Sequence, residues 1–204
     1  MNYNTNDIII LCIFTVVLYT YFFNNRLKEQ FKYITSTKPI GYIDIRKDNK
    51  LYTIHIELYE KDTPMAVKNF KHLLTGNRGF NSDNISLSYK YSSFYKIKPN
   101  KVLYGGDFIH NNGTGGQSIY GHNFKDEVKG LKKNHSIGTI GMINDGKKNN
   151  NDSRFFINLK NNPEYNNKNV VIGSIVSNFH VLQELSQNPN SKATIVNCGL
   201  VYNI

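Results

Sequence analysis

Short apolar stretches separated by glycine and asparagine fill most of the chain after residue 41, and this pattern constrains the fold more than any other feature. Tyr42–Ile45 and Tyr52–Leu58 alternate apolar and polar residues around the turn Lys47–Lys50, which predicts an antiparallel hairpin. Further short apolar stretches lie at 94–97, 102–104, 138–142, 155–159, 170–176 and 193–201. Stretches of this kind, separated by turn residues, predict a mainly β domain of the barrel type.

Two helices are expected beside these strands. Asp62 or Thr63 fits the N-cap of the first, Pro64 fits its first turn, and Gly76 fits its end. An apolar spacing of three to four residues returns at 181–185, which predicts a second short helix.

The N-terminal region contains an apolar run at residues 8–23 without a charge, glycine or proline. As a helix it would span roughly 24 Å, enough for a thin bilayer of about 27 Å with interfacial flanking residues. We predict a single-pass transmembrane anchor at 8–23, after a tail at 1–7 and before a polar spacer at 24–40 and one domain at 41–204. A cleaved signal peptide is the alternative, but residues 1–7 lack Lys and Arg and no small-residue cleavage pattern follows.

Basic residues after the apolar run indicate how it is oriented. Arg26, Lys28 and Lys32 follow it and Asp7 precedes it, so the positive-inside rule places the domain on the cytoplasmic side. In a secretory lumen, the sequons would instead accept glycans. These sequons start at Asn84, Asn112, Asn134 and Asn151.

Composition adds weaker constraints. The net charge of +10 fits an anion-binding surface, but the absence of Trp and the abundance of Asn, Ile and Tyr also fit AT-rich coding, so we predict no specific nucleic-acid partner. Cys12 and Cys198 form no CxxC pair and are predicted to be buried thiols. The six His residues show no ligand spacing, so no metal or cofactor is predicted. Lys132–Lys133 and Lys147–Lys148 are either a basic rim or solvated loop charges.

The most distinctive string is Gly105–Phe108 followed by Asn112–Gly121. Its glycines permit backbone conformations that other residues resist, and the string does not match a phosphate-binding loop, so it indicates a structural requirement. With other strings in the same order, it resembles the cyclophilin family. These are Ile56–Tyr59, Thr63–Phe70, Leu74–Gly76, Phe124–Glu127, Ser153–Ile157, Val170–Gly173 and Asn197–Gly199.

This resemblance implies an eight-stranded antiparallel barrel capped by two α-helices, with a groove for proline peptides on its outer face. It also implies catalysis of X-Pro isomerisation without a covalent step. In cyclophilins an arginine donates a hydrogen bond towards the prolyl nitrogen as the amide twists, an apolar pocket holds the ring, and polar groups fix the flanking carbonyls. Lys96 stands where the family places that arginine, and is predicted to be catalytic with one flexible ammonium in place of a planar fork.

The resemblance also assigns the substrate-binding residues, and most of them differ from the family pattern. They are Val102, Tyr104, Ile143, Asn144, Arg154, Phe156, Tyr165 and Asn169. Only Asn144 and Phe156 match the family. Val102 stands for Met, Tyr104 and Arg154 for Gln, Tyr165 for Leu and Asn169 for His. Lys101 and Glu164 replace a pocket Phe and a Trp, and Ile143 and Asp145 predict a narrower, more acidic groove.

Single matches have structural alternatives: Phe156 as a core aromatic, Asn144 as a turn residue, and Lys96 and Lys101 as solvated lysines. Taken together, they predict a cyclophilin-type peptidyl-prolyl isomerase that acts on proline-containing proteins or peptides, helps folding or assembly, and has weakened activity. The alternative is a catalytically inactive binding or structural module on a membrane or virion. Because the Trp is missing, we do not expect cyclosporin binding.

Overall fold

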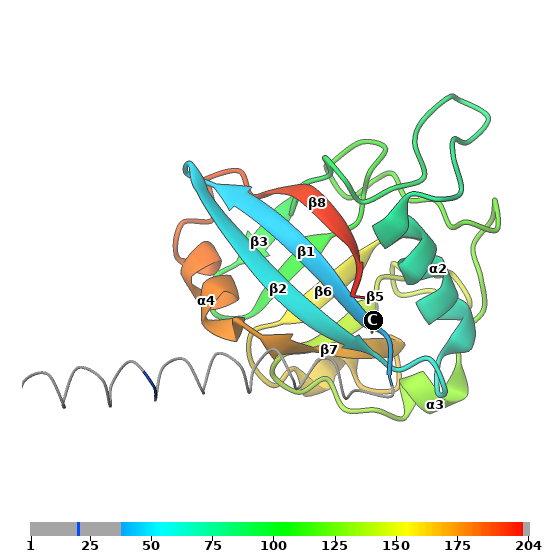
Figure 1. Cartoon of the computed structure of the whole chain (residues 1–204). Helices are drawn as coiled ribbons and strands as arrows, with labels where there is room; N and C mark the ends of the chain where they lie inside the picture. Colours follow the sequence, from blue (N-terminus) through cyan, green and yellow to red (C-terminus); the bar gives the residue numbers. More distant parts are fainter. Residues whose placement is uncertain (1–19, 21–37, 202–204) are drawn as a thin grey trace, which may run out of the picture. The chain divides into compact units, whose positions relative to one another are not determined.

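The fold is organised around one sheet of eight antiparallel strands, which follow one another in the order β3-β4-β6-β5-β7-β2-β1-β8 (Figure 1). The structure is a computed structural model that describes Thr20 and residues 38–201. The strands are β1 (Ile40–Lys47), β2 (Lys50–Leu58), β3 (Lys96–Lys98), β4 (Val102–Gly105), β5 (Thr139–Met142), β6 (Phe155–Asn158), β7 (Val171–Ser177) and β8 (Thr194–Val201).

The two edges of this sheet are joined, which gives it a barrel-like shape. Ser93, just before β3, forms a β-bridge with Thr194 of β8. The backbone N–H of Phe94 also donates to the carbonyl of Ala193 at 2.9 Å. The prediction of eight antiparallel strands is therefore confirmed.

Three α-helices accompany the sheet among the described residues: α2 (Pro64–Thr75), α3 (Val128–Leu131) and α4 (Phe179–Gln187), with a 3₁₀ helix at Pro163–Tyr165. Helices α2 and α4 lie on opposite sides of the barrel in Figure 1. The prediction of two helices was wrong by one, because α3 is too short to show a helical apolar period in the sequence.

The core fills the inside of the barrel. Ile54, Ile56 and Leu58 alternate inward along β2, and all three are fully buried. Phe70 of α2 meets Phe155 of β6 edge to face, with ring centroids 5.3 Å apart. Successive side chains of a strand point to opposite faces of a sheet, so the residues next to these core residues in the strands point towards the outer face of the barrel.

The N-terminus of α2 is capped from a distant part of the chain. Thr63 occupies the N-cap position, but its hydroxyl donates to the Tyr59 carbonyl and caps no helix N–H. The carboxylate of Glu127 instead accepts hydrogen bonds from the N–H groups of Met65 and Ala66, both at 2.9 Å. A negative charge at this end of the helix also interacts favourably with its dipole.

Asp107 organises the glycine-rich segment that follows β4. Its side chain is fully buried and accepts backbone hydrogen bonds from 109, 110, 112, 113 and 115. Burial opposes ionisation, but these donors outweigh it and lower the pKa of Asp107. Gly106 has a φ of +85°, and a Cβ there would lie 2.5 Å from the carbonyl oxygen of Ser153. The structural role predicted for this string agrees with this geometry.

Two sequence predictions concern residues at the N-terminus. The anchor at 8–23 lies, except for Thr20, outside the described residues, as does Cys12. Among the residues that are described, we find no helix with the length and apolarity needed to cross a membrane.

Cys198 is a buried free thiol, as predicted, and burial raises its pKa to about 12.

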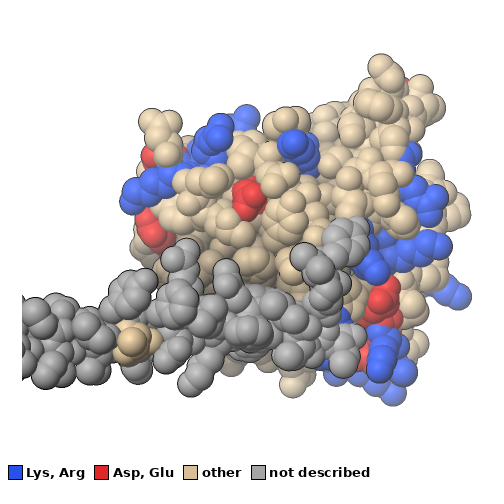
Figure 2. Space-filling model, in the orientation of Figure 1, with Lys and Arg blue, Asp and Glu red and all other residues tan. Residues whose placement is uncertain are grey.

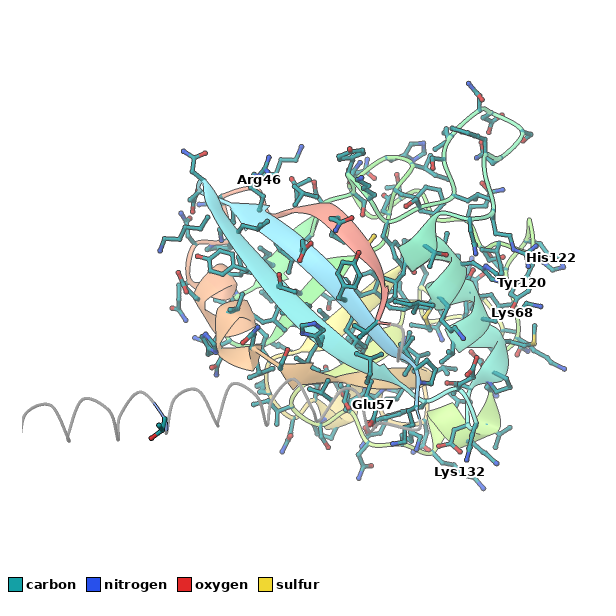
Figure 3. The ribbon with its side chains drawn as sticks, in the orientation of Figure 1. Arg46, Glu57, Lys68, Tyr120, His122 and Lys132 are labelled. Atoms are coloured by element: carbon teal, nitrogen blue, oxygen red, sulfur yellow. The ribbon has the colours of Figure 1, made fainter. Side chains whose placement is uncertain are left out.

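Charged side chains are spread over the surface of the domain. On the face shown in Figure 2, Lys and Arg lie mostly towards the margin, with Asp and Glu between them. Figure 3 shows the same face with Arg46 near the end of β1 and Lys68 on the outer side of α2. Nothing on this face gathers the net positive charge into a single site.

Candidate active site

A row of residues crosses the outer face of the barrel. In the strand registers, Lys96 of β3 is opposite Tyr104 of β4, Tyr104 is opposite Phe156 of β6, and Phe156 is opposite Gly141 of β5. Directly opposite residues have their side chains on the same face of a sheet. The register therefore brings together the predicted catalytic lysine and two predicted substrate-binding aromatics.

Phe156 is the centre of this row and is enclosed by other rings. Its ring stacks on His135 at 5.3 Å with an interplanar angle of 20°, and it contacts Tyr165 at 4.8 Å and Tyr104 at 6.1 Å. Only 1% of Phe156 is exposed. A prolyl ring can therefore reach Phe156 only if one of the surrounding side chains moves.

Gly141 makes this arrangement possible. A Cβ at this position would lie 2.5 Å from the Phe156 ring and 2.7 Å from the His135 ring. Real Cβ atoms essentially never approach other heavy atoms so closely. The absence of a side chain at Gly141 thus leaves room for both rings.

His135 is held in its neutral form beneath the site. Its Nε2 lies 3.0 Å from the Asn169 carbonyl, and its Nδ1 lies 3.2 Å from the Nδ2 of Asn158. Because the amide nitrogen of Asn158 donates and the carbonyl of Asn169 accepts, the proton is assigned to Nε2. Burial lowers the pKa of His135.

Two tyrosines cover Phe156 on the solvent side. The hydroxyls of Tyr104 and Tyr165 lie 2.9 Å apart and share a hydrogen bond. Burial and this hydrogen bond raise the pKa of Tyr104. We call the hydrogen-bonded pair Tyr104–Tyr165 the tyrosine lid.

Lys96 and Lys98 lie beside the lid. Their Nζ atoms are 5.9 Å and 5.7 Å from the centre of the Tyr104 ring. Both ammonium groups are therefore within cation–π distance of the same ring. The sequence singled out Lys96 but not Lys98, because only the resemblance distinguished them.

A cavity of about 790 Å³ adjoins the lid, and we call it the groove. The segments that form it are helix α3, the loop at 143–149 and the segment at 164–169. The residues lining it are Tyr104, Asp126, Val128, Leu131, Ile143, Asn144, Asp145, Gly146, Lys147, Lys148, Asn149, Phe156, Glu164, Tyr165, Asn167, Lys168 and Asn169. Six predicted substrate-binding residues belong to this set: Tyr104, Ile143, Asn144, Phe156, Tyr165 and Asn169.

Asn144 connects two walls of the groove. Its Nδ2 donates to the carbonyl of Lys168 at 2.7 Å, and its Oδ1 accepts from the Nδ2 of Asn169 at 3.2 Å. Its backbone carbonyl accepts from the N–H of Lys147 across a turn whose central residues have positive φ. The Asp-Gly pair in this turn suits the type I′ geometry. Asn144 is therefore both a turn residue, the alternative considered for it, and part of the groove.

Arg154 and Val102 lie outside the set of groove-lining residues, and both are buried. The guanidinium of Arg154 donates to Asp152 at 2.6 Å, to Asp145 at 2.6 Å and to the carbonyl of Gly113 at 2.7 Å. Burial opposes this charge, but the two carboxylates outweigh it and raise the pKa of Arg154. A substrate contact by Arg154 would require it to exchange one of these partners.

Lys101 and Glu164 form an ion pair at 2.8 Å, with each side chain partly exposed. These are the positions where the resemblance places a pocket Phe and a Trp. At these two positions the structure has two charges that bind each other. Sequence reasoning noted both replacements but not that they pair, since 101 and 164 are far apart in the chain.

The two lysine pairs singled out in the sequence lie in different surroundings. Lys147 and Lys148 line the groove, whereas Lys133 pairs with Asp62 at 2.8 Å and lies over the Tyr59 ring. Sequence reasoning missed His135 and Lys168, because no motif marks either residue. Within the part of the chain that the structure describes, no three His, Cys, Asp or Glu side chains are grouped to hold a metal ion.

Comparison with known proteins bears on this geometry. Residues 42–200 match the family model described as cyclophilin type peptidyl-prolyl cis-trans isomerase/CLD. The chain is also similar to a peptidyl-prolyl cis-trans isomerase, cyp11, of Rhizopus delemar, with 36% identity over 170 residues, which cover 79% of this chain and 50% of the relative. The chain thus spans about half the length of that curated relative. From the extent of the family match and this identity, the chain belongs to the cyclophilin-type peptidyl-prolyl cis-trans isomerase family.

Proposed function

We propose that this protein is a peptidyl-prolyl cis-trans isomerase of weakened activity, with Lys96 as the catalytic residue. The observation that supports it is the cross-strand row in which Lys96, Tyr104 and Phe156 lie side by side. A cation, a hydrogen-bonding hydroxyl and an aromatic ring in one row are the groups that a twisted prolyl amide requires.

The reaction needs stabilisation of a twisted amide and no covalent intermediate. Rotation about the X-Pro bond is slow because amide resonance resists it, with a barrier of about 18–20 kcal/mol for peptide bonds in general. A cation near the prolyl nitrogen stabilises the pyramidal geometry that develops as resonance is lost. The ammonium of Lys96 can donate one hydrogen bond there, whereas a guanidinium offers a rigid fork, so we expect a lower rate.

The tyrosine lid lowers the activity further. A prolyl ring must displace Tyr165 or Tyr104 to contact Phe156, which is 1% exposed. The free energy for opening the lid is subtracted from the binding free energy of the substrate. The ion pair between Lys101 and Glu164 also offers the ring less apolar surface.

Exchange NMR on an X-Pro peptide tests this proposal with four proteins: wild type, Lys96→Ala, Lys96→Arg and Lys98→Ala. We expect acceleration by the wild type, its loss in Lys96→Ala, and a higher rate in Lys96→Arg. Lys98→Ala is the matched control, because Lys98 contacts the same Tyr104 ring at almost the same distance. Full activity in Lys96→Ala would refute the role of Lys96.

A second candidate function is a binding module without catalysis. The coverage of Phe156 by the lid and the pairing of Lys101 with Glu164 favour it, because both reduce the surface open to proline. The same NMR experiment separates the candidates. Peptide binding without acceleration, at protein concentrations that saturate the peptide, would support the module and exclude the isomerase.

We also propose that residues 8–23 anchor the protein to a membrane, with the domain on the cytoplasmic side. The support is the uncharged apolar run, followed by Arg26, Lys28 and Lys32. Resistance to alkaline carbonate extraction would test the anchor. A glycosidase-sensitive gel shift would place the sequons in a secretory lumen and refute the orientation.

A further inference from the structure

The acidic residues of the groove are all bound to partners within the protein. Asp126 accepts hydrogen bonds from the N–H of Asn149 at 2.9 Å and the Nδ2 of Asn151 at 2.8 Å. Asp145 binds the guanidinium of Arg154, and Glu164 binds Lys101. Two of the three acids of the groove therefore have a cationic partner, and the third, Asp126, is hydrogen-bonded by neutral donors.

The lysines of the groove are in the opposite situation. Lys147, Lys148 and Lys168 line the groove and are exposed. Among the described residues, no hydrogen bond or ion pair engages their ammonium groups. The sequence predicted a more acidic groove from Asp145, but Asp145 and Glu164 are each bound to a cation of the protein, so the groove charges without an ion-pair partner include all three lysines.

The backbone holds these lysines at a common site. The turn at Asn144–Lys147 presents Lys147 and Lys148, and the segment after the 3₁₀ helix presents Lys168. The hydrogen bond from Asn144 to the carbonyl of Lys168 ties the two segments together. Beyond the lid, Lys96 and Lys98 add two cations that lie over the Tyr104 ring.

We propose that the groove selects X-Pro segments that carry Asp or Glu near the proline, with Lys147, Lys148 and Lys168 as the residues that determine this specificity. This inference rests on the proposed function, since it takes an X-Pro segment as the occupant. Exposed ion pairs are weak individually, but three together are expected to give about a tenfold preference. Because the charges are exposed, the preference must decrease with salt.

Fluorescence anisotropy with the full-length chain in non-ionic detergent tests the proposal. Three labelled peptides are compared: one with Glu residues flanking a Gly-Pro, one with Gln in place of Glu, and one with Glu retained but Pro replaced by Ala. We expect the first to bind about tenfold more tightly than the second at low salt, and about equally at 0.5 M NaCl. The triple variant Lys147→Gln/Lys148→Gln/Lys168→Gln should abolish the difference.

The matched control removes the same charge elsewhere. Lys68, Lys90 and Lys192 are exposed and lie outside the groove, and Lys68 is on the outer side of α2 (Figure 3). The triple Gln variant at these positions should keep the tenfold preference. A similar loss in both variants would mean that net charge alone attracts the peptide, and would overturn the assignment.

The remaining outcomes separate this inference from the proposed function. Equal binding of the Glu-Pro and Gln-Pro peptides, with no binding of the Ala peptide, would refute charge selection and leave the isomerase proposal intact. Equal binding of the Glu-Pro and Glu-Ala peptides would refute proline recognition and leave charge selection intact. If single-stranded RNA binds more tightly than the acidic peptide, and the groove variant loses that binding, the assignment of a peptide as occupant is wrong.

Discussion

Replacing Tyr165 by phenylalanine removes one hydroxyl and leaves the ring that covers Phe156. The lost hydrogen bond to Tyr104 spans 2.9 Å and is worth about 1 kcal/mol net. The ring contact between Tyr165 and Phe156 at 4.8 Å contributes about 0.5–1.5 kcal/mol more. Opening the lid therefore costs about 1.5–2.5 kcal/mol, which weakens proline binding roughly 10- to 60-fold.

Tyr165→Phe is expected to change stability and activity in opposite directions. The free energy of unfolding should fall by about 1 kcal/mol, while kcat/KM for an X-Pro peptide should rise about fivefold, because the open lid is more populated. Tyr165→Leu restores the residue type of the family pattern. It removes both the hydrogen bond to Tyr104 and the ring contact with Phe156, so it should give the larger increase in kcat/KM. Urea unfolding and exchange NMR measure the two quantities.

A double-mutant cycle tests whether one hydrogen bond is responsible. Tyr104→Phe breaks the same bond, so the double variant should be no more active than either single variant. Tyr91→Phe is the control, since Tyr91 is highly exposed and belongs to neither the lid nor the groove. Additive gains, or a fall in both activity and stability in Tyr165→Phe, would refute the lid.

Three further predictions concern groups that hold the domain together. Glu127→Gln should lower the free energy of unfolding by about 1–2 kcal/mol through the loss of the charged cap of α2. Glu60→Gln, which loses only a surface ion pair with Lys71, should lower it by less; equal urea midpoints would contradict this. Asp107→Asn should cost about 2–3 kcal/mol in the same assay, because one amide oxygen cannot replace a carboxylate bound by this set of N–H donors, and an unchanged midpoint would show that they find other partners. The folded pKa of His135 is lowered, so its contribution to stability is complete above the unfolded value of about 6.5 and is lost as pH falls from there towards the folded pKa. Urea unfolding at pH 7.5 and 5.0 should show that the free energy of unfolding falls less between these pH values in His135→Asn than in the wild type. His55→Gln should reduce the loss as well, because burial also lowers the pKa of His55, and an unchanged loss in His135→Asn would contradict the role of His135.

Local sequence pattern was enough to predict the strands, whereas the residues of the row at the candidate site were identified only through the family resemblance. The period of two in β1 and β2 and the turn at Asp48–Asn49, both with positive φ, are determined by neighbouring residues. The family strings marked the segments that form β4 and β6, and the strand register of the structure then placed Tyr104 opposite Phe156. The short helix α3 was not predicted, because four residues are too few to show the apolar period of a helix.

The side-chain contacts that decide the chemistry of the site could not be predicted from local sequence pattern. Tyr104 meets Tyr165, Lys101 meets Glu164, and Glu127 caps α2, in each case across a long separation in sequence. Such pairs depend on where loops fold over the sheet, and a side chain's type does not specify which distant partner it reaches. The residues with chemistry were therefore largely visible in the sequence alone, but only the tertiary structure decided that the aromatic contact is covered, that the acids are paired and that the lysines remain available.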